Sequence, residues 1–69
     1  MSLMDMEYLK YRIRKDNMNL EEFAQMIGIS RTSFYKKLKG ETEWTCEEMK
    51  KIKDTLNISV EEFNKIFGF

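Results

Sequence analysis

Four helix starts in this chain share one local pattern, and this repeated pattern restricts the fold more than any other feature. In a capping box, a side-chain oxygen at the helix start and a glutamate three residues later satisfy backbone N–H groups that lack partners inside the helix. The chain contains three such boxes: Asn19 with Glu22, Thr45 with Glu48, and Ser59 with Glu62. A fourth start has Ser30 as its cap, with Ser33 in the position of the acid. The pattern predicts four short helices with well-defined beginnings.

Each of these starts also has an apolar residue just before the cap and another one four positions after it. Such a pair, called a hydrophobic staple, sets the angle at which the chain enters a helix. The four pairs are Met18 and Phe23, Ile29 and Phe34, Trp44 and Met49, and Ile58 and Phe63. Since each cap typically contributes about 1 kcal/mol, caps and staples together divide the chain into separate short helices.

A fifth helix is predicted upstream, over residues 5–15, because Met6, Leu9 and Ile13 recur at helical spacing and would share one buried face. The other four helices are predicted over residues 20–27, 31–39, 46–56 and 60–67. Their expected core residues are Phe23, Ala24, Ile27, Phe34, Leu38, Met49, Ile52, Leu56, Val60, Phe63, Ile66 and Phe67. The chain has no proline and only three glycines. We therefore expect an all-α fold with five short helices around one core.

The length of 69 residues permits one domain, near the lower limit for folding without disulfides or metals. We interpret residues 5–69 as this domain and residues 1–4 as a leader, for which a cloning remnant is one explanation. The single cysteine, Cys46, excludes an internal disulfide and fits a reducing, cytoplasmic location, and we expect it to be half-buried packing. No apolar run approaches the roughly 20 residues of a membrane span.

The residue types also argue against an enzyme. With no histidine and one cysteine, the chain lacks the usual zinc ligand sets and the common nucleophile–base pairs. The paired glutamates fall in the first turns of predicted helices, where negative charge opposes the helix dipole. We therefore expect no catalytic residues, no cofactor, no metal and no small-molecule substrate.

Between residues 19 and 40 the sequence predicts two amphipathic helices joined by a very short turn. Gly28 ends the first helix, because glycine readily adopts the left-handed conformation that closes a helix. Ser30 begins the second helix at once, so the two helices must cross steeply, as in a helix-turn-helix. Residues 29–40 contain four basic residues and no acid, although the formal net charge of the chain is zero. This distribution favours a local basic surface for the DNA backbone.

Helical spacing of about 100° per residue divides the second of these helices into two faces, with Phe34 and Leu38 pointing inward. Candidates for contact with base edges are the polar residues on the outward face and its flanks: Arg31, Thr32, Ser33, Tyr35 and Lys36. Candidates for phosphate contact are Lys37, Lys39 and, at the start of the preceding helix, Asn19. A basic helix face is more often only a solvated surface. The glycine joint and the absence of acids in residues 29–40 favour DNA binding over that alternative.

From residue 9 to residue 67 the chain resembles the phage repressor and Cro-like helix-turn-helix domains of the xenobiotic-response-element (XRE) type. The resemblance is carried by Asn19-Leu20-Glu21-Glu22-Phe23-Ala24, by Ile27-Gly28-Ile29-Ser30-Arg31-Thr32-Ser33-Phe34, by the Lys39-Gly40 stop, and by Leu56-Asn57-Ile58-Ser59-Val60-Glu61-Glu62-Phe63. Residues 33–40 with Trp44-Thr45 are especially similar to small phage-encoded Cro-like proteins of Gram-positive hosts. The resemblance implies a five-helix, lambda-repressor-like domain that dimerises on a palindromic operator and regulates transcription.

Carried over by position, the resemblance implies base contacts at Arg31, Thr32 and Lys36 and phosphate contacts at Lys39 and Thr42. The chain departs from the family pattern at two places. Leu20 stands where many members have a glutamine that contacts DNA, and leucine cannot make that bond. The loop after the second helix, often basic or polar in the family, holds Glu41 and Glu43. Both departures predict weaker DNA affinity or a shift of contact onto the second helix alone.

The sequence thus leads to two functional hypotheses. The first is a sequence-specific transcriptional regulator, a phage or prophage Cro-like repressor that binds a double-stranded DNA operator as a homodimer. The alternative is a protein-interaction module of the same fold, an antirepressor or an antitoxin, which the neutral net charge and the acidic residues 41–49 favour. At the C-terminus, Phe63 and Phe67 are expected in the core, and Phe69 is left available for a subunit interface.

Overall fold

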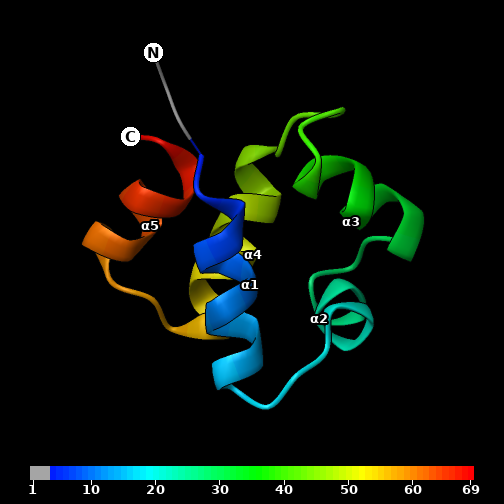
Figure 1. The fold of residues 1–69 in the computed structure, drawn as a ribbon, viewed down its shortest axis with the longest axis horizontal. Coiled ribbons are helices and arrows are strands. Elements are labelled where there is room, and N and C mark those ends of the chain that lie inside the picture. The colour runs from blue at the N-terminus through cyan, green and yellow to red at the C-terminus, as the bar shows by residue number, and fades with distance from the viewer. Residues whose placement is uncertain (1–3) are drawn as a thin grey trace.

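The computed structural model describes residues 4–69 and contains all five predicted helices (Figure 1). They are α1 (Met6–Lys15), α2 (Leu20–Met26), α3 (Arg31–Leu38), α4 (Cys46–Leu56) and α5 (Val60–Phe67). No strand occurs within residues 4–69, so the prediction of an all-α fold is confirmed. Of the proposed leader, residues 1–3 lie outside the described residues, and Met4 is exposed.

The helices begin where the capping pattern predicts. The boxes at Asn19, Thr45 and Ser59 are all closed in both directions, with each glutamate bonded back to the backbone N–H of its cap. Ser30 Oγ accepts a hydrogen bond from the Ser33 backbone N–H at 3.1 Å. The first helix has a cap as well, because Asp5 Oδ1 accepts from the backbone N–H of Tyr8 at 3.0 Å. Local capping therefore determines how the whole chain is divided into helices.

The core consists of twelve buried apolar residues drawn from all five helices and the turns between them: Leu9, Ile13, Phe23, Ala24, Ile27, Phe34, Trp44, Ile52, Leu56, Ile58, Ile66 and Phe67. Four expected core residues are only partly buried and pack against this cluster: Met6, Leu38, Met49 and Phe63. The core thus follows the predicted faces of the helices, with the edges of those faces left half-exposed.

Two expectations about burial are wrong. Val60 has an exposed fraction of 61%, and Cys46 is exposed rather than half-buried. Both are the first residues of their helices. In each case the apolar residue two positions earlier fills the core instead, Ile58 before α5 and Trp44 before α4. The staple residue thus occupies the buried place and leaves the first helical residue at the surface.

One polar cluster ties α1 to α4 and α5. Glu62 Oε2 accepts hydrogen bonds from the Tyr8 hydroxyl and from Arg12 Nη1, each at 2.6 Å. Arg12 Nη2 also donates to the carbonyl of Leu56 at 3.0 Å, at the end of α4. Near the start of α1, the backbone N–H of Asp5 donates to the carbonyl of Ile66 at 2.9 Å. With α5 fixed on this side, α2 and α3 form the opposite end of the molecule (Figure 1).

Candidate nucleic-acid interface

The joint between α2 and α3 has the tight geometry that the sequence predicts. Gly28 has a φ angle of +81°, which an L-residue adopts only with strain. Beyond it, the backbone N–H of Ile29 donates to the carbonyl of Ala24 at 3.0 Å and so closes the end of α2. Ser30 then caps α3 directly. Only Gly28 and Ile29 lie between Ile27, the C-terminal cap of α2, and Ser30, the N-terminal cap of α3. Because this connection is so short, α2 fixes the direction of α3.

The rotation of α3 about its own axis is set by one buried aromatic ring. Phe34 is fully buried. Its ring centroid lies 5.9 Å from that of Phe23 on α2 and 5.9 Å from that of Trp44, in the tilted and edge-on arrangements that aromatic pairs prefer. With Phe34 held from two sides, the opposite face of α3 points to solvent at the edge of the molecule (Figure 1).

Most of the candidate DNA-contacting residues are accessible. Arg31, Thr32 and Lys36 are exposed on α3, and Ser33 and Tyr35 are half-buried on its flanks. Of the candidates for phosphate contact, three are exposed at or beyond helix ends: Asn19, Lys39 and Thr42. The structure therefore brings the five base-contact candidates together on one short helix, with Lys39 at its C-terminal cap.

Lys37 is buried, so the prediction that it contacts phosphate is wrong. Its side chain is only 8% exposed. Its ammonium donates to the carbonyl of Glu43 at 2.8 Å, lies 3.0 Å from Glu48 Oε1, and sits 5.8 Å from the centroid of the Trp44 ring. The turn after α3 folds back over this side of the helix and encloses the amine. Lys37 therefore holds α3 against the start of α4 and is not available to DNA.

The ion pair with Lys37 also affects the acid. Burial by itself raises the pKa of the Glu48 carboxyl, but hydrogen bonds from Thr45 and Lys37 outweigh it and leave the pKa lowered. Glu48 Oε1 accepts from the Thr45 backbone N–H at 2.9 Å, so the same oxygen closes the capping box of α4. The charged Glu48 therefore caps the start of α4 and, through its ion pair with Lys37, also holds α3 in position.

Arg31 has an acidic neighbour on the exposed face. Its Nη1 lies 3.5 Å from Oε1 of Glu21 in the first turn of α2, and its guanidinium lies 5.7 Å from the centroid of the Tyr35 ring. Both side chains of the ion pair are more than half exposed, at 66% and 59%. An exposed pair of this kind is weak. Arg31 is thus oriented on α3 but can exchange Glu21 for a stronger anionic partner.

Sequence reasoning did not select Arg14, which lies next to the candidate surface. A cavity of about 370 Å³ beside Tyr35 is lined by Arg14, Met18, Asn19, Leu20, Glu21 and Tyr35. Arg14 is exposed and belongs to the basic last turn of α1. That basic turn was visible in the sequence, but its proximity to Asn19 and Tyr35 depends on how α1 packs. We therefore add Arg14 to the candidates for phosphate contact.

Within residues 4–69, no group of three or more histidine, cysteine, aspartate or glutamate side chains is arranged to hold a metal ion. No helix in that part of the chain combines the length and apolar character needed to cross a membrane.

Two helices joined by a glycine turn, with the second one carrying a basic exposed face at the edge of an all-helical domain, define a helix-turn-helix DNA-binding protein. Comparison with known families agrees with this class. The chain matches the family described as the Cro/C1-type HTH DNA-binding domain over residues 8–67, and it belongs to that family. The protein is accordingly a DNA-binding transcription regulator. Neither the curated proteins nor the solved structures provide a significant match to the chain.

Proposed function

We propose that this protein is a phage or prophage Cro-like repressor that binds a pseudo-palindromic operator as a homodimer. The observation that carries the proposal is the exposed face of α3, where Arg31, Thr32 and Lys36 are presented to solvent by a helix that contains no acidic residue. These side chains can donate hydrogen bonds to guanine and to other base edges in the major groove. The similarity of residues 33–40 and Trp44-Thr45 to small phage-encoded Cro-like proteins supports the phage origin.

In the proposed complex, two-fold symmetry sets the two copies of α3 about 34 Å apart, which is one turn of duplex DNA. Lys39, Thr42, Asn19 and Arg14 flank α3 and contact phosphates on either side of the groove. If roughly three to five phosphates are neutralised per subunit, the affinity falls steeply with salt, with a log–log slope of about −0.9 for each phosphate.

The test is a fluorescence-anisotropy titration of the protein against DNA fragments that flank its own gene, at several salt concentrations and with excess nonspecific competitor. The proposal expects binding that resists competitor, falls with salt, and protects two symmetric half-sites from cleavage. Sedimentation on the same fragment should give two copies per site. One copy per site, or a single half-site, would remove the dimer from the proposal.

A protein-interaction module of the same fold is the second candidate, and specific observations favour it. Glu21 forms an ion pair with Arg31 on the surface of the molecule. Glu41 and Glu43 are exposed in the turn that follows α3. These acids oppose the approach of phosphates. An antirepressor or antitoxin of this kind would show no competitor-resistant binding in the same titration.

A further inference from the structure

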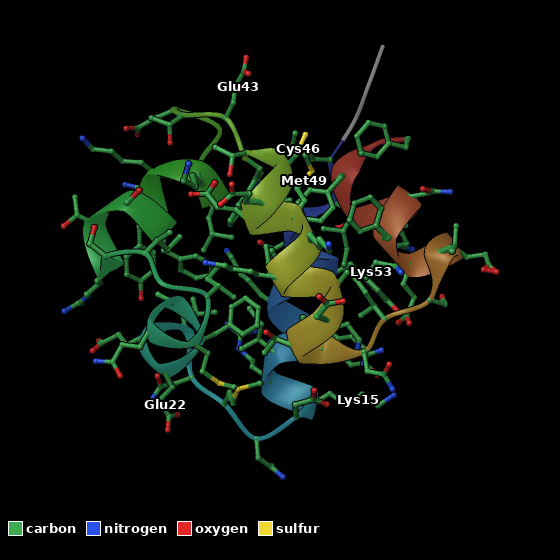
Figure 2. All side chains as sticks on the ribbon, turned by 180° about the vertical axis from the view of Figure 1, so that it is seen from behind. Lys15, Glu22, Glu43, Cys46, Met49 and Lys53 are labelled. Carbon is green, nitrogen blue, oxygen red and sulfur yellow. The ribbon has the colours of Figure 1, made fainter. Side chains whose placement is uncertain are left out.

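A second surface, which no residue of α3 lines, lies between α4 and α5. It is a groove with a volume of about 320 Å³, and six residues line it: Cys46, Met49, Lys50, Lys53, Phe63 and Phe69. Cys46, Met49 and Lys53 follow one another along the face of α4 seen in Figure 2, on the side of α5. Figure 1 places α3 and α5 at opposite ends of the molecule, and α5 contributes Phe63 to this groove.

The floor of the groove is apolar and held in place. Phe69 has an exposed fraction of 74%, yet its ring stacks on Phe63 with 5.9 Å between centroids and 9° between planes. The backbone N–H of Phe69 donates to the carbonyl of Asn64 at 2.9 Å, and Phe63 packs against the buried ring of Phe67 at 5.0 Å. Because this aromatic ring is held in place yet exposed to water, its burial by a bound partner would be favourable.

The rim of the groove is basic. Lys50 and Lys53 line it from α4, and no acidic residue does. Neither lysine forms an ion pair within residues 4–69. The groove therefore combines a slot for large apolar side chains with two unpaired positive charges at its edge.

We propose that this α4–α5 groove docks a short amphipathic segment of another protein, one that presents large apolar side chains flanked by aspartate or glutamate. Charge complementarity selects this occupant over a second copy of the chain. In a two-fold contact the same patch meets itself, so a second copy would bring two more lysines and no acid to the groove, whereas an acidic segment would neutralise the rim. The proposal assigns Phe69 to this groove and not to a subunit interface, and it does not depend on DNA binding.

The experiment uses the full chain and two synthetic helical peptides. Both peptides carry leucine and phenylalanine at positions i, i+3, i+4 and i+7; one has glutamate at the flanking positions and the other has lysine there. Binding is followed by anisotropy of the labelled peptide. Occupancy of the groove is followed by the rate at which iodoacetamide alkylates Cys46, the single cysteine of the chain. The acidic peptide is expected to bind and to slow alkylation, and the basic peptide to do neither.

Three variants locate the contact. Phe69→Ala should weaken the acidic peptide about tenfold or more, because it removes the exposed aromatic anchor. Lys50→Glu should weaken it about two- to fivefold through the rim charge. Lys51→Glu is the matched control, since this exposed lysine is adjacent on α4 but does not line the groove. Circular dichroism checks that each variant keeps its helices.

Three results would overturn the proposal. The first is equal binding, or no binding, of the two peptides. The second is equal weakening by Lys50→Glu and Lys51→Glu. The third is slower alkylation of Cys46 as the concentration of the protein alone is raised, with a dimer in sedimentation, which would make a second copy the occupant.

Discussion

The ammonium of Lys37 lies 3.0 Å from Glu48 Oε1 and joins the candidate DNA-reading helix to the first turn of α4. Both side chains are largely buried, at 8% and 16% exposed. The same amine donates to the carbonyl of Glu43 at 2.8 Å, so it also fastens the turn that connects α3 to α4. One lysine thus fixes the C-terminal half of α3 against the body of the protein, much as Phe34 fixes its inner face.

Replacing Lys37 by methionine keeps most of the side-chain length and removes these charged hydrogen bonds. We expect Lys37→Met to lower the free energy of unfolding by about 2 kcal/mol, since hydrogen bonds to charged groups contribute about that much. DNA affinity should fall because α3 loses a support, but the salt slope should stay unchanged. Urea denaturation followed by Trp44 fluorescence measures the first effect, and salt titrations of DNA binding measure the second.

Lys39→Met provides the contrast. Lys39 is exposed at the C-terminal cap of α3, so its replacement should change the free energy of unfolding by no more than about 0.5 kcal/mol. Its salt slope should become shallower by about 0.9 per subunit, as expected for a lost phosphate contact. If instead Lys37→Met made the slope shallower, Lys37 would be a phosphate contact after all.

The starts of the helices could be predicted because capping depends on residues only three positions apart. Glu48 and Glu62 were identified from the sequence as members of capping boxes, and the structure confirms both. Their second partners could not be identified in the same way. Glu62 meets Tyr8, which is 54 residues away, and that meeting depends on how α1 packs against α5.

The candidate reading face was predictable for a similar reason, and the error at Lys37 shows where the reasoning fails. The 100° spacing of an isolated helix places Lys37 only at the edge of the face defined by Phe34 and Leu38, three positions after Phe34, and so does not decide whether its side chain is buried. It cannot show that the following turn folds back and covers that side of α3. Arg14 was missed because it lies on another helix. Tertiary packing, which the spacing within one helix cannot show, brings it from α1 toward the surface of α2 and α3.

Glu62 makes stability depend on pH. The hydrogen bond from Tyr8, followed by that from the Ser59 backbone, lowers the pKa of Glu62 from its usual value of 4.5 to about 2. Because the pKa is lower in the folded protein, the charged carboxylate stabilises the fold fully above about pH 4.5, and this stabilisation is lost as the pH falls towards 2. We therefore expect the free energy of unfolding to decrease across that window.

The substitution Glu62→Gln tests the carboxylate: glutamine can still close the capping box, but it removes the charge and the second acceptor oxygen, which Tyr8 and Arg12 use. The variant should be less stable at neutral pH and show a flatter profile between pH 4.5 and 2. Denaturation at a series of pH values gives both quantities. The neighbouring Glu61→Gln, on an exposed side chain, is the control and should keep the pH profile of the parent. An unchanged profile in Glu62→Gln would rule out Glu62 as the source of the pH dependence.

Arg31 is the residue on which we expect base recognition to depend most. Arg31→Ala should weaken operator binding by about 1–3 kcal/mol and relax the preference at one base position of each half-site. The measurement is binding to a set of operators in which each base pair is changed in turn. If discrimination among those operators is unaltered by Arg31→Ala, the proposed reading face on α3 is incorrect.

Glu21 competes with DNA for Arg31, so its removal should strengthen binding. The pair is held at 3.5 Å between exposed side chains, and DNA must displace it before Arg31 can reach a base. We expect Glu21→Gln to tighten operator binding about two- to fivefold, the range that corresponds to a weak surface ion pair. Glu61→Gln is again the matched control, because Glu61 holds the same first-turn position in α5, at the far end of the molecule from α3. If the change in net charge alone were responsible, both variants would tighten operator binding to the same extent.

The double variant Glu21→Gln/Arg31→Ala separates the remaining possibilities. If Glu21 acts through Arg31, the gain in affinity disappears in the Arg31→Ala background. A gain that persists there would mean that Glu21 repels the DNA backbone directly.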